Sequence, residues 1–139
     1  MPELHLNYGA VAVAAVATFM LGGLWYTALF GKTWQRLHGY SEEKVKAMQA
    51  ARPPAVFFSV MLISYFVLAI AVGVVFSVAG VQSAIGGAAL GFMLWLGLCA
   101  AIGATEHIAS DRHIGVYMID RSYQLLSLVM IGVIIGAWK

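Results

Sequence analysis

The chain has 139 residues, of which 62% are hydrophobic and only 10% are charged. A soluble domain carries about 25% charged residues, so this sequence has too little polar surface to cover itself in water. The net charge of +2 is too small to indicate binding of nucleic acid. The sequence contains no nucleotide-binding glycine loop, no zinc-protease motif and no serine-hydrolase motif, and its single cysteine, Cys99, cannot form an internal disulfide.

Four apolar segments are long enough to cross a bilayer, whose ~30 Å hydrocarbon core needs roughly 20 apolar residues in helical form. We predict spans at about 9–30, 55–80, 83–105 and 115–138, with a long connection at 31–54. The length leaves no room for a second domain. The sequence therefore predicts an all-α fold, with residues 1–139 forming one transmembrane four-helix bundle.

Lysine and arginine residues are distributed unevenly between the two ends of this predicted bundle. Seven of them lie in or beside the connections that follow the first and third spans: Lys32, Arg36, Lys44, Lys46, Arg52, Arg112 and Arg121. On the opposite side the basic residue is Lys139. Because basic loops stay in the cytoplasm, we expect both termini outside and the 31–54 loop inside.

The cytoplasmic loop is expected to be helical in part. Residues 32–38 can continue the first helix as far as Gly39, where a glycine permits the chain to turn. Ser41 can cap a second short helix, whose first turn holds two acidic residues favoured by the helix dipole. Pro53 and Pro54 mark the end of that helix or the start of the second span.

Small residues at a spacing of four suggest where helices approach one another closely. Lipid provides no hydrophobic drive for helices to associate, so backbone approach at small residues becomes important. The glycines that we assign to such faces are Gly73, Gly87, Gly91, Gly132 and Gly136. Each face can serve either the internal bundle or a dimer. Trp95, near the middle of the third span, is expected to face another helix and to find a partner for its indole N–H.

Polar residues gather around the connection between the third and fourth spans. The candidates for a ligand site or an ion path are Glu106, His107, His113, Asp120, Gln124 and Ser127. The last three follow one another at spacings of four and three, which places them on one face of a helix. They would form a polar stripe that enters the membrane from the cytoplasmic side. No catalytic set, metal site or cofactor is predicted.

Asp120 allows two interpretations. Inside the bundle it would pair with Arg121 or His107, or accept a hydrogen bond from Trp25 or Tyr26. Alternatively it lies with Arg121 at the headgroup boundary, and residues 106–113 form an ordinary charged loop.

The segment GGLWYTALFGKTWQRLHGYSEE (22–43) resembles the signature of the domain of unknown function 1761 family, which contains small bacterial membrane proteins with four predicted spans. The matching residues include Asn7, Gly22, Trp25, Tyr26, Gly31 and Trp34. The tail MIDRSYQLLSLVMIGVIIGAW (118–138) is similar to the last span of that family. The sequence departs from the pattern at Thr27-Ala28, where the family often has Ser-Pro, so a proline-induced helix break is not expected there. The resemblance implies a fold and a multi-pass location in a bacterial cytoplasmic (inner) membrane, but no activity.

Two functional hypotheses follow from these features. The first is a non-enzymatic membrane protein that acts by helix–helix association, as a scaffold or accessory subunit, in a homo-oligomer such as a homodimer or with another membrane protein. The second is a small transporter or channel for a proton, a cation or a small amphiphile, working as a dimer. Both hypotheses place the protein in the lipid bilayer, and neither involves nucleic acid.

Overall fold

A computed structural model of the protein describes residues 3–138. It is helical, and no strand occurs among those residues. Four helical segments are long and apolar enough to cross a membrane, as predicted: Tyr8–Leu29, Pro54–Ala79, Ala84–Ala109 and Ile114–Ala137.

The first and third of these segments each contain a π-helical stretch. In the first, α1 (Tyr8–Leu24) continues into η1 (Trp25–Leu29). In the third, α5 (Ala84–Leu94), η2 (Trp95–Ala100) and α6 (Ala101–Ala109) follow one another without interruption. The second and fourth segments, α4 (Pro54–Ala79) and α7 (Ile114–Ala137), are regular.

Two short helices occupy the connection between the first two long segments. They are α2 (Gly31–Leu37) and α3 (Glu42–Ala51). The backbone turns at Phe30 (φ −122°, ψ 2°) before α2 begins, so the helix breaks there without a proline. Gly39 ends the α2 region with a positive φ of 72°, which a glycine adopts without strain.

Side chains cap the helix starts, which explains where most helices begin. Asn7 accepts a hydrogen bond from the backbone N–H of Ala10, and Ser41 accepts one from Lys44. Ser83 caps α5 in the same way. At the start of α7 the cap is His113, whose ring nitrogen accepts from the N–H of Gly115 at 2.9 Å.

The third long helix extends one turn beyond the predicted end at Thr105. It continues to Ala109, so Glu106 and His107 stand on a helix instead of in a loop. Hydropathy marks where the apolar stretch ends, whereas the helix itself can continue into a polar region as long as its side chains reach water.

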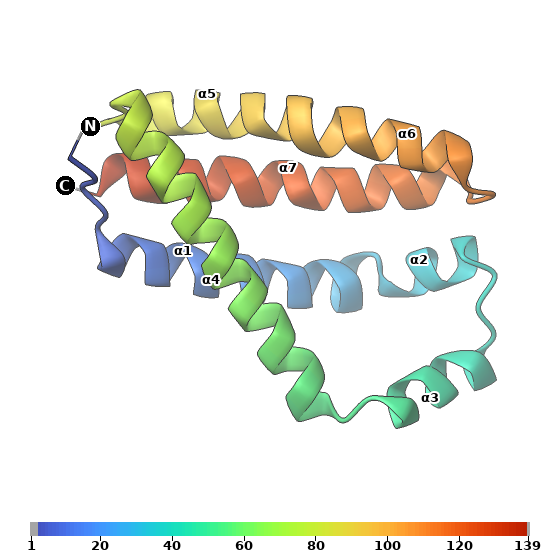
Figure 1. Ribbon diagram of the computed structural model, residues 1–139. Coiled ribbons are helices and arrows are strands. Elements are labelled where there is room, and N and C mark those ends of the chain that lie inside the picture. The colour runs from blue at the N-terminus through green and yellow to red at the C-terminus, as the bar shows by residue number, and fades with distance from the viewer. Residues whose placement is uncertain (1–2, 139) are drawn as a thin grey trace.

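The long helices run between two ends of the molecule (Figure 1). One, which we name the terminal end, carries both termini and the short turn between α4 and α5. The other, which we name the basic end, carries α2, α3 and the connection from α6 to α7. The helices α1, α5–α6 and α7 lie side by side, while α4 crosses them diagonally.

Glycines bring α5 and α7 into backbone contact. A Cβ added at Gly87 would collide with the carbonyl oxygen of Gly132, and one at Gly91 with that of Leu128. A Cβ at Gly136 would collide with the carbonyl of Ser83. Four of the five predicted packing glycines therefore lie in one interface. Gly73 differs, because an added Cβ there would meet the side chain of Leu6 at 2.8 Å.

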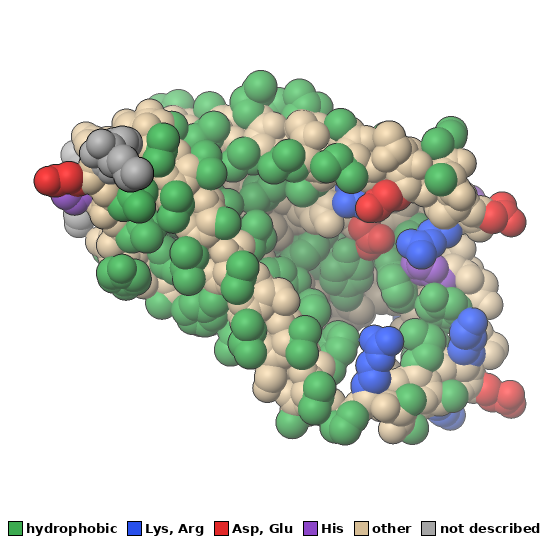
Figure 2. Space-filling model, in the orientation of Figure 1, with side chains coloured by type: hydrophobic (Ala, Val, Ile, Leu, Met, Phe, Trp, Pro, Cys, Tyr) green, Lys and Arg blue, Asp and Glu red, His purple; other side chains and the backbone are tan. Residues whose placement is uncertain are grey.

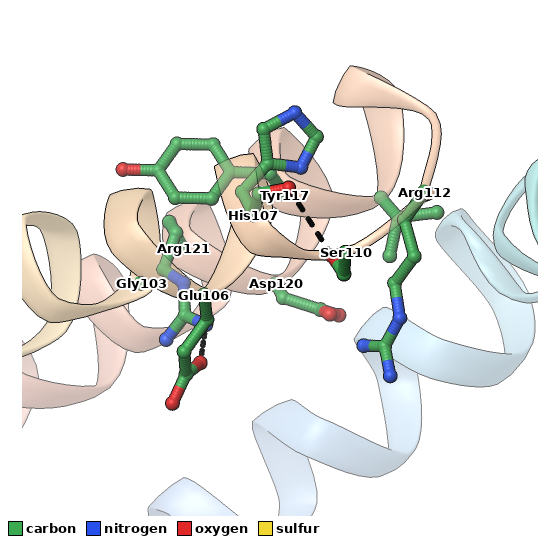
Figure 3. A pocket seen from close by; sticks show the side chains of 9 residues that line it. Gly103, Glu106, His107, Ser110, Arg112, Tyr117, Asp120 and Arg121 are labelled. Atoms are coloured by element: carbon green, nitrogen blue, oxygen red, sulfur yellow. Dashed lines mark hydrogen bonds and ion pairs between the residues drawn. The ribbon is translucent and has the colours of Figure 1, made fainter.

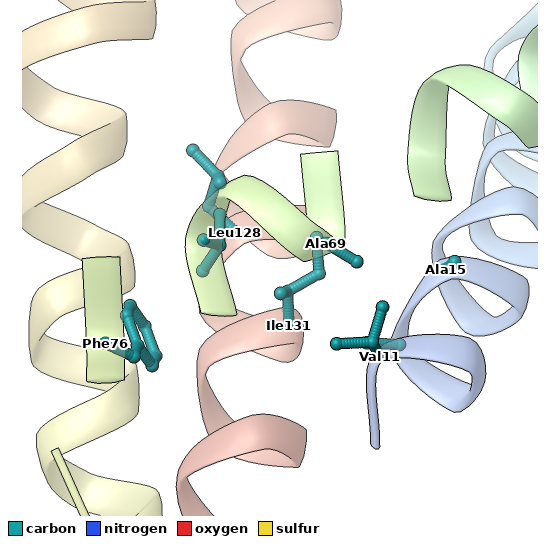
Figure 4. Packing of buried hydrophobic residues seen from close by; sticks show 8 residues of the cluster. Val11, Ala15, Ala69, Phe76, Leu128 and Ile131 are labelled. Carbon is teal, nitrogen blue, oxygen red and sulfur yellow. The ribbon is translucent and has the colours of Figure 1, made fainter. Parts of the chain in front are cut away.

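The apolar core lies where α4 crosses α1 and α7 (Figure 4). Its buried residues are Val11, Ala14, Ala15, Ala69, Val72, Phe76, Leu128 and Ile131. All of the core residues on α4 come from its second half. The first half diverges from the other long helices, and every residue from Pro54 to Val60 is exposed.

Candidate functional site

A polar pocket of about 370 Å³ lies at the basic end between α6 and α7 (Figure 3). It is lined by Gly103, Glu106, His107, Ser110, Arg112, Val116, Tyr117, Asp120 and Arg121. Figure 2 shows acidic and basic side chains together at the edge of a hollow beside α4, and the walls of that hollow are largely hydrophobic.

Asp120 is held by two aromatic side chains from the first part of the chain. Its Oδ1 accepts hydrogen bonds from the Tyr26 hydroxyl at 2.7 Å and from the Trp34 indole Nε1 at 3.0 Å. Tyr26 is one of the four partners considered from the sequence, whereas Trp34 was not considered. Both donors are neutral, and no Lys, Arg or His pairs with Asp120 in the described part of the chain.

Arg121 pairs with Glu106, and not with Asp120, which was one of the alternatives considered from the sequence. Its guanidinium donates to Gln124 Oε1 at 2.7 Å and to Glu106 Oε2 at 3.3 Å. The side chain is 19% exposed, and its buried Nε has no hydrogen-bond partner among residues 3–138. A Cβ at Gly103 would collide with this guanidinium, so the glycine leaves the space that Arg121 occupies.

Two tryptophans, each the first residue of a π-helical stretch, donate to α7 on either side of Asp120. Trp25 Nε1 donates to the carbonyl of Ile119 at 3.1 Å, and Trp95 Nε1 donates to the carbonyl of Arg121 at 2.8 Å. The expectation that Trp95 faces another helix and finds a partner is therefore confirmed. Tyr117 of α7 donates in the opposite direction, to the carbonyl of Ala100 at the end of η2. Such π-helical insertions occur frequently at functional sites.

The signature residues of the first helix meet α7 near the same point. A Cβ at Gly22 would lie 2.8 Å from the Tyr123 hydroxyl, which donates to the carbonyl of Thr18. A Cβ at Gly31 would collide with the carbonyl oxygen of Tyr26, so this glycine permits the turn that brings Trp34 to Asp120. Asn7 lies apart from the pocket, as the cap of α1.

The predicted polar stripe does not continue along α7. Glu106, His107 and Asp120 line the pocket, and Gln124 reaches it through Arg121. Ser127 is buried, and its hydroxyl donates back to the carbonyl of Tyr123 in the same helix. His113 caps the helix instead of lining the pocket. Spacing along a helix gives the direction of a side chain but not whether a neighbouring helix covers it.

Sequence reasoning overlooked Arg112 and Ser110 as lining residues. Both lie in the short connection before α7, where no periodicity indicates which side chains point inward. Their proximity to Glu106 and Asp120 along the chain was the available signal. Within residues 3–138, no group of three His, Cys, Asp or Glu side chains could hold a metal ion.

His38 lies close to the site at the end of α2. Its ring packs on Trp34, with the ring centroids 4.1 Å apart, and it stacks on Tyr40. Burial lowers the pKa of His38, and the positive charge of Arg112 lowers it further, while Asp120 opposes the shift. This histidine is therefore favoured in its neutral form.

Comparison with known proteins agrees with the resemblance seen in the sequence. No curated protein and no solved structure matches this chain. Residues 9–136, nearly the whole chain, match the family described as "Protein of unknown function (DUF1761)". The resemblance is confirmed, and the chain belongs to the DUF1761 family.

Proposed function

We propose that this protein is a non-enzymatic integral membrane protein that acts by helix–helix association, with a second copy of itself as the first partner. The observation that carries the proposal is a stripe of β-branched residues on α4 at alternating spacings of four and three. We name it the α4 stripe, and it consists of Val56, Val60, Ile63, Val67 and Ile70. All five side chains are exposed, from 43% at Ile70 to 63% at Ile63.

This spacing is the heptad pattern by which two helices pack along a seam. β-branched side chains have few rotamers in a helix, so they lose little conformational entropy when a partner covers them. The first half of α4 has no helix beside it on this face within the protomer, so a second α4 can approach without rearrangement. These features support a homodimer in which the α4 stripes of two copies meet.

Disulfide cross-linking in native membranes tests this dimer. Single cysteines are introduced at Val60 and Ile63 in a Cys99→Ala background, because a two-fold seam brings each position close to its own copy. Oxidation is expected to give a covalent dimer at both. The matched control is Ile85→Cys, since Ile85 is apolar and 84% exposed but lies on α5. Equal cross-linking at all three positions, or none at Val60 and Ile63, contradicts the proposal.

We further propose that the basic end faces the cytoplasm of a bacterium and that both termini lie outside. The arrangement of the helices supports this orientation, because the connections that are rich in Lys and Arg lie at one end of the molecule (Figure 1). Single cysteines at Gln49 and Gln82, again in a Cys99→Ala background, are exposed to a membrane-impermeant thiol reagent on spheroplasts. We expect labelling at Gln82 and protection at Gln49, and the reverse pattern overturns the orientation.

A second candidate function is transport or binding of a small ion or amphiphile, and the pocket between α6 and α7 favours it. Ligand pockets have volumes of about 300–1,000 Å³, and this one, at about 370 Å³, is at the small end of that range. The adjoining hollow beside α4 offers an apolar surface next to the charged residues. An α4-mediated dimer would place the two hollows near the shared seam.

A further inference from the structure

The charges that line the pocket between α6 and α7 are balanced. Glu106 and Asp120 contribute two carboxylates, while Arg112 and Arg121 contribute two guanidiniums. A ligand that is only anionic would meet the carboxylates, and one that is only cationic would meet the guanidiniums.

One guanidinium and one carboxylate of the pocket pair with each other. Arg121 donates to Glu106 at 3.3 Å, so this pair is largely satisfied within the protein. Among the described residues, Asp120 and Arg112 take part in no ion pair, with each other or with any other side chain. One carboxylate and one guanidinium therefore remain in the same pocket, available to a ligand.

The two remaining groups differ in how firmly they are held. Asp120 is fixed through Oδ1 by Tyr26 and Trp34, which leaves Oδ2 without a hydrogen-bond partner in the described part of the chain. Arg112 lies in the exposed connection before α7, so its guanidinium can adjust to a bound group. Figure 3 shows Asp120 between the Arg121–Glu106 pair and Arg112, with its carboxylate directed toward the Arg112 side.

We infer that this pocket binds a zwitterionic group, with an ammonium at Asp120 and an oxyanion at Arg112. The hydrophobic hollow next to the charges suits an acyl chain, so the ligand class is a zwitterionic amphiphile such as a phosphatidylethanolamine-type lipid. A free zwitterion shares the headgroup chemistry and is distinguished by experiment. The inference rests on the second candidate function, whose ligand it specifies.

Titration calorimetry of the full chain in maltoside micelles tests the inference. Three single-chain probes of equal chain length are compared: a lysophosphatidylethanolamine, an anionic lysophosphatidylglycerol and a primary alkylamine. A fourth probe, glycerophosphoethanolamine, is a phosphodiester that carries the same zwitterion without a chain. We expect the zwitterionic lysolipid to bind at least about tenfold more tightly than the singly charged amphiphiles, because each of those leaves one pocket charge unpaired.

Variants locate the binding. Asp120→Asn keeps an oxygen for Tyr26 and Trp34, and Arg112→Gln changes an exposed side chain, so both should stay folded. Each is expected to weaken binding of the zwitterionic lysolipid by about tenfold. The matched controls are Asp111→Asn and Arg36→Gln, exposed residues of the same types that do not line the pocket. They should bind as the wild type does.

The outcomes separate the inference from the function on which it rests. Preference for the lysolipid over glycerophosphoethanolamine supports a membrane lipid as the source, and equal affinity supports a free zwitterion. If the anionic lysolipid or the alkylamine binds as tightly as the zwitterion, the inference is overturned while an amphiphile site stands. If no probe binds, both fail. Wild-type affinity in the Asp120→Asn and Arg112→Gln proteins also overturns the inference.

Discussion

The two halves of α7 are held against their neighbours by different forces. Toward the terminal end, Gly132 and Gly136 bring its backbone against that of α5, and almost nothing polar takes part. Toward the basic end, the helix is held by hydrogen bonds that Trp25 and Trp95 donate to its carbonyls and by the bonds to Asp120. Because lipid gives no hydrophobic drive for helix association, a helix needs either close packing or polar bonds. In α7 both are used, one in each half.

The largest expected effect comes from breaking the close-packed half. Gly132→Leu would force the backbones of α7 and α5 apart, because the added side chain collides with the carbonyl of Gly87. Overpacking of this kind costs about 3 kcal/mol. Thermal unfolding in mild detergent measures it. The matched control is Gly97→Leu in the same span as Gly87, since a Cβ at Gly97 meets nothing within 4 Å. A Gly132→Leu protein as stable as this control would disprove the packing role.

Removal of Asp120 tests the polar half. Asp120→Leu leaves the Tyr26 hydroxyl and the Trp34 indole N–H without their acceptor, at a cost of about 2–3 kcal/mol of unfolding free energy. Asp120→Asn keeps an acceptor oxygen and should cost about 1 kcal/mol or less. Melting curves of the wild type and the two variants in one detergent give the order of their stabilities. A Leu variant that melts with the wild type would mean that these hydrogen bonds contribute little and that Asp120 behaves as a headgroup residue.

Loss of a single tryptophan bond should have a smaller effect. Trp95→Phe retains most of the ring but loses the donor to the carbonyl of Arg121, so we expect a loss of about 1 kcal/mol. Trp138→Phe serves as the control, because Trp138 is 46% exposed and its side chain makes no hydrogen bond to any other described residue. If both variants lose the same stability, the effect comes from the ring and not from the hydrogen bond.

The smallest expected effect is a dependence of the unfolding free energy on pH. It arises at His38, which packs on Trp34 beside the polar half of α7. The pKa of His38 is lowered in the folded state, so the unfolded chain binds a proton more readily. Stability is therefore complete above the unfolded histidine pKa of about 6.5 and decreases as the pH falls below it. His38→Gln should reduce this decrease, whereas His5→Gln at the terminal end should not. An unchanged pH profile in the His38→Gln protein would exclude the coupling.

Several features of the fold follow from sequence patterns that act locally. Ser41 was predicted as a helix cap, because a cap bonds to a backbone N–H only three residues away. Gly39 ends a helix because of its own conformational freedom. The third long helix continues to Ala109, one turn beyond the predicted span end at Thr105, because a helix can extend past the point where hydropathy falls.

The candidate site could be predicted only in part. Glu106, His107 and Asp120 were identified as polar residues near one end of a span, and all three line the pocket. Ser127 was grouped with them by spacing, yet it is buried and bonded within its own helix. Whether a polar residue faces a pocket or a neighbouring helix depends on how the helices are rotated about their axes, which a repeat of small residues does not fix.

By itself, the sequence determined that four helices are long and apolar enough to cross a membrane, because hydropathy is read from consecutive residues and in lipid the backbone must bond within its own helix. Only the tertiary structure decided that Tyr26 and Trp34 meet Asp120, since those partners lie 94 and 86 residues apart. It also decided that the first half of α4 diverges from the bundle. Both outcomes depend on crossing angles and helix rotation, which arise from many side-chain contacts acting together.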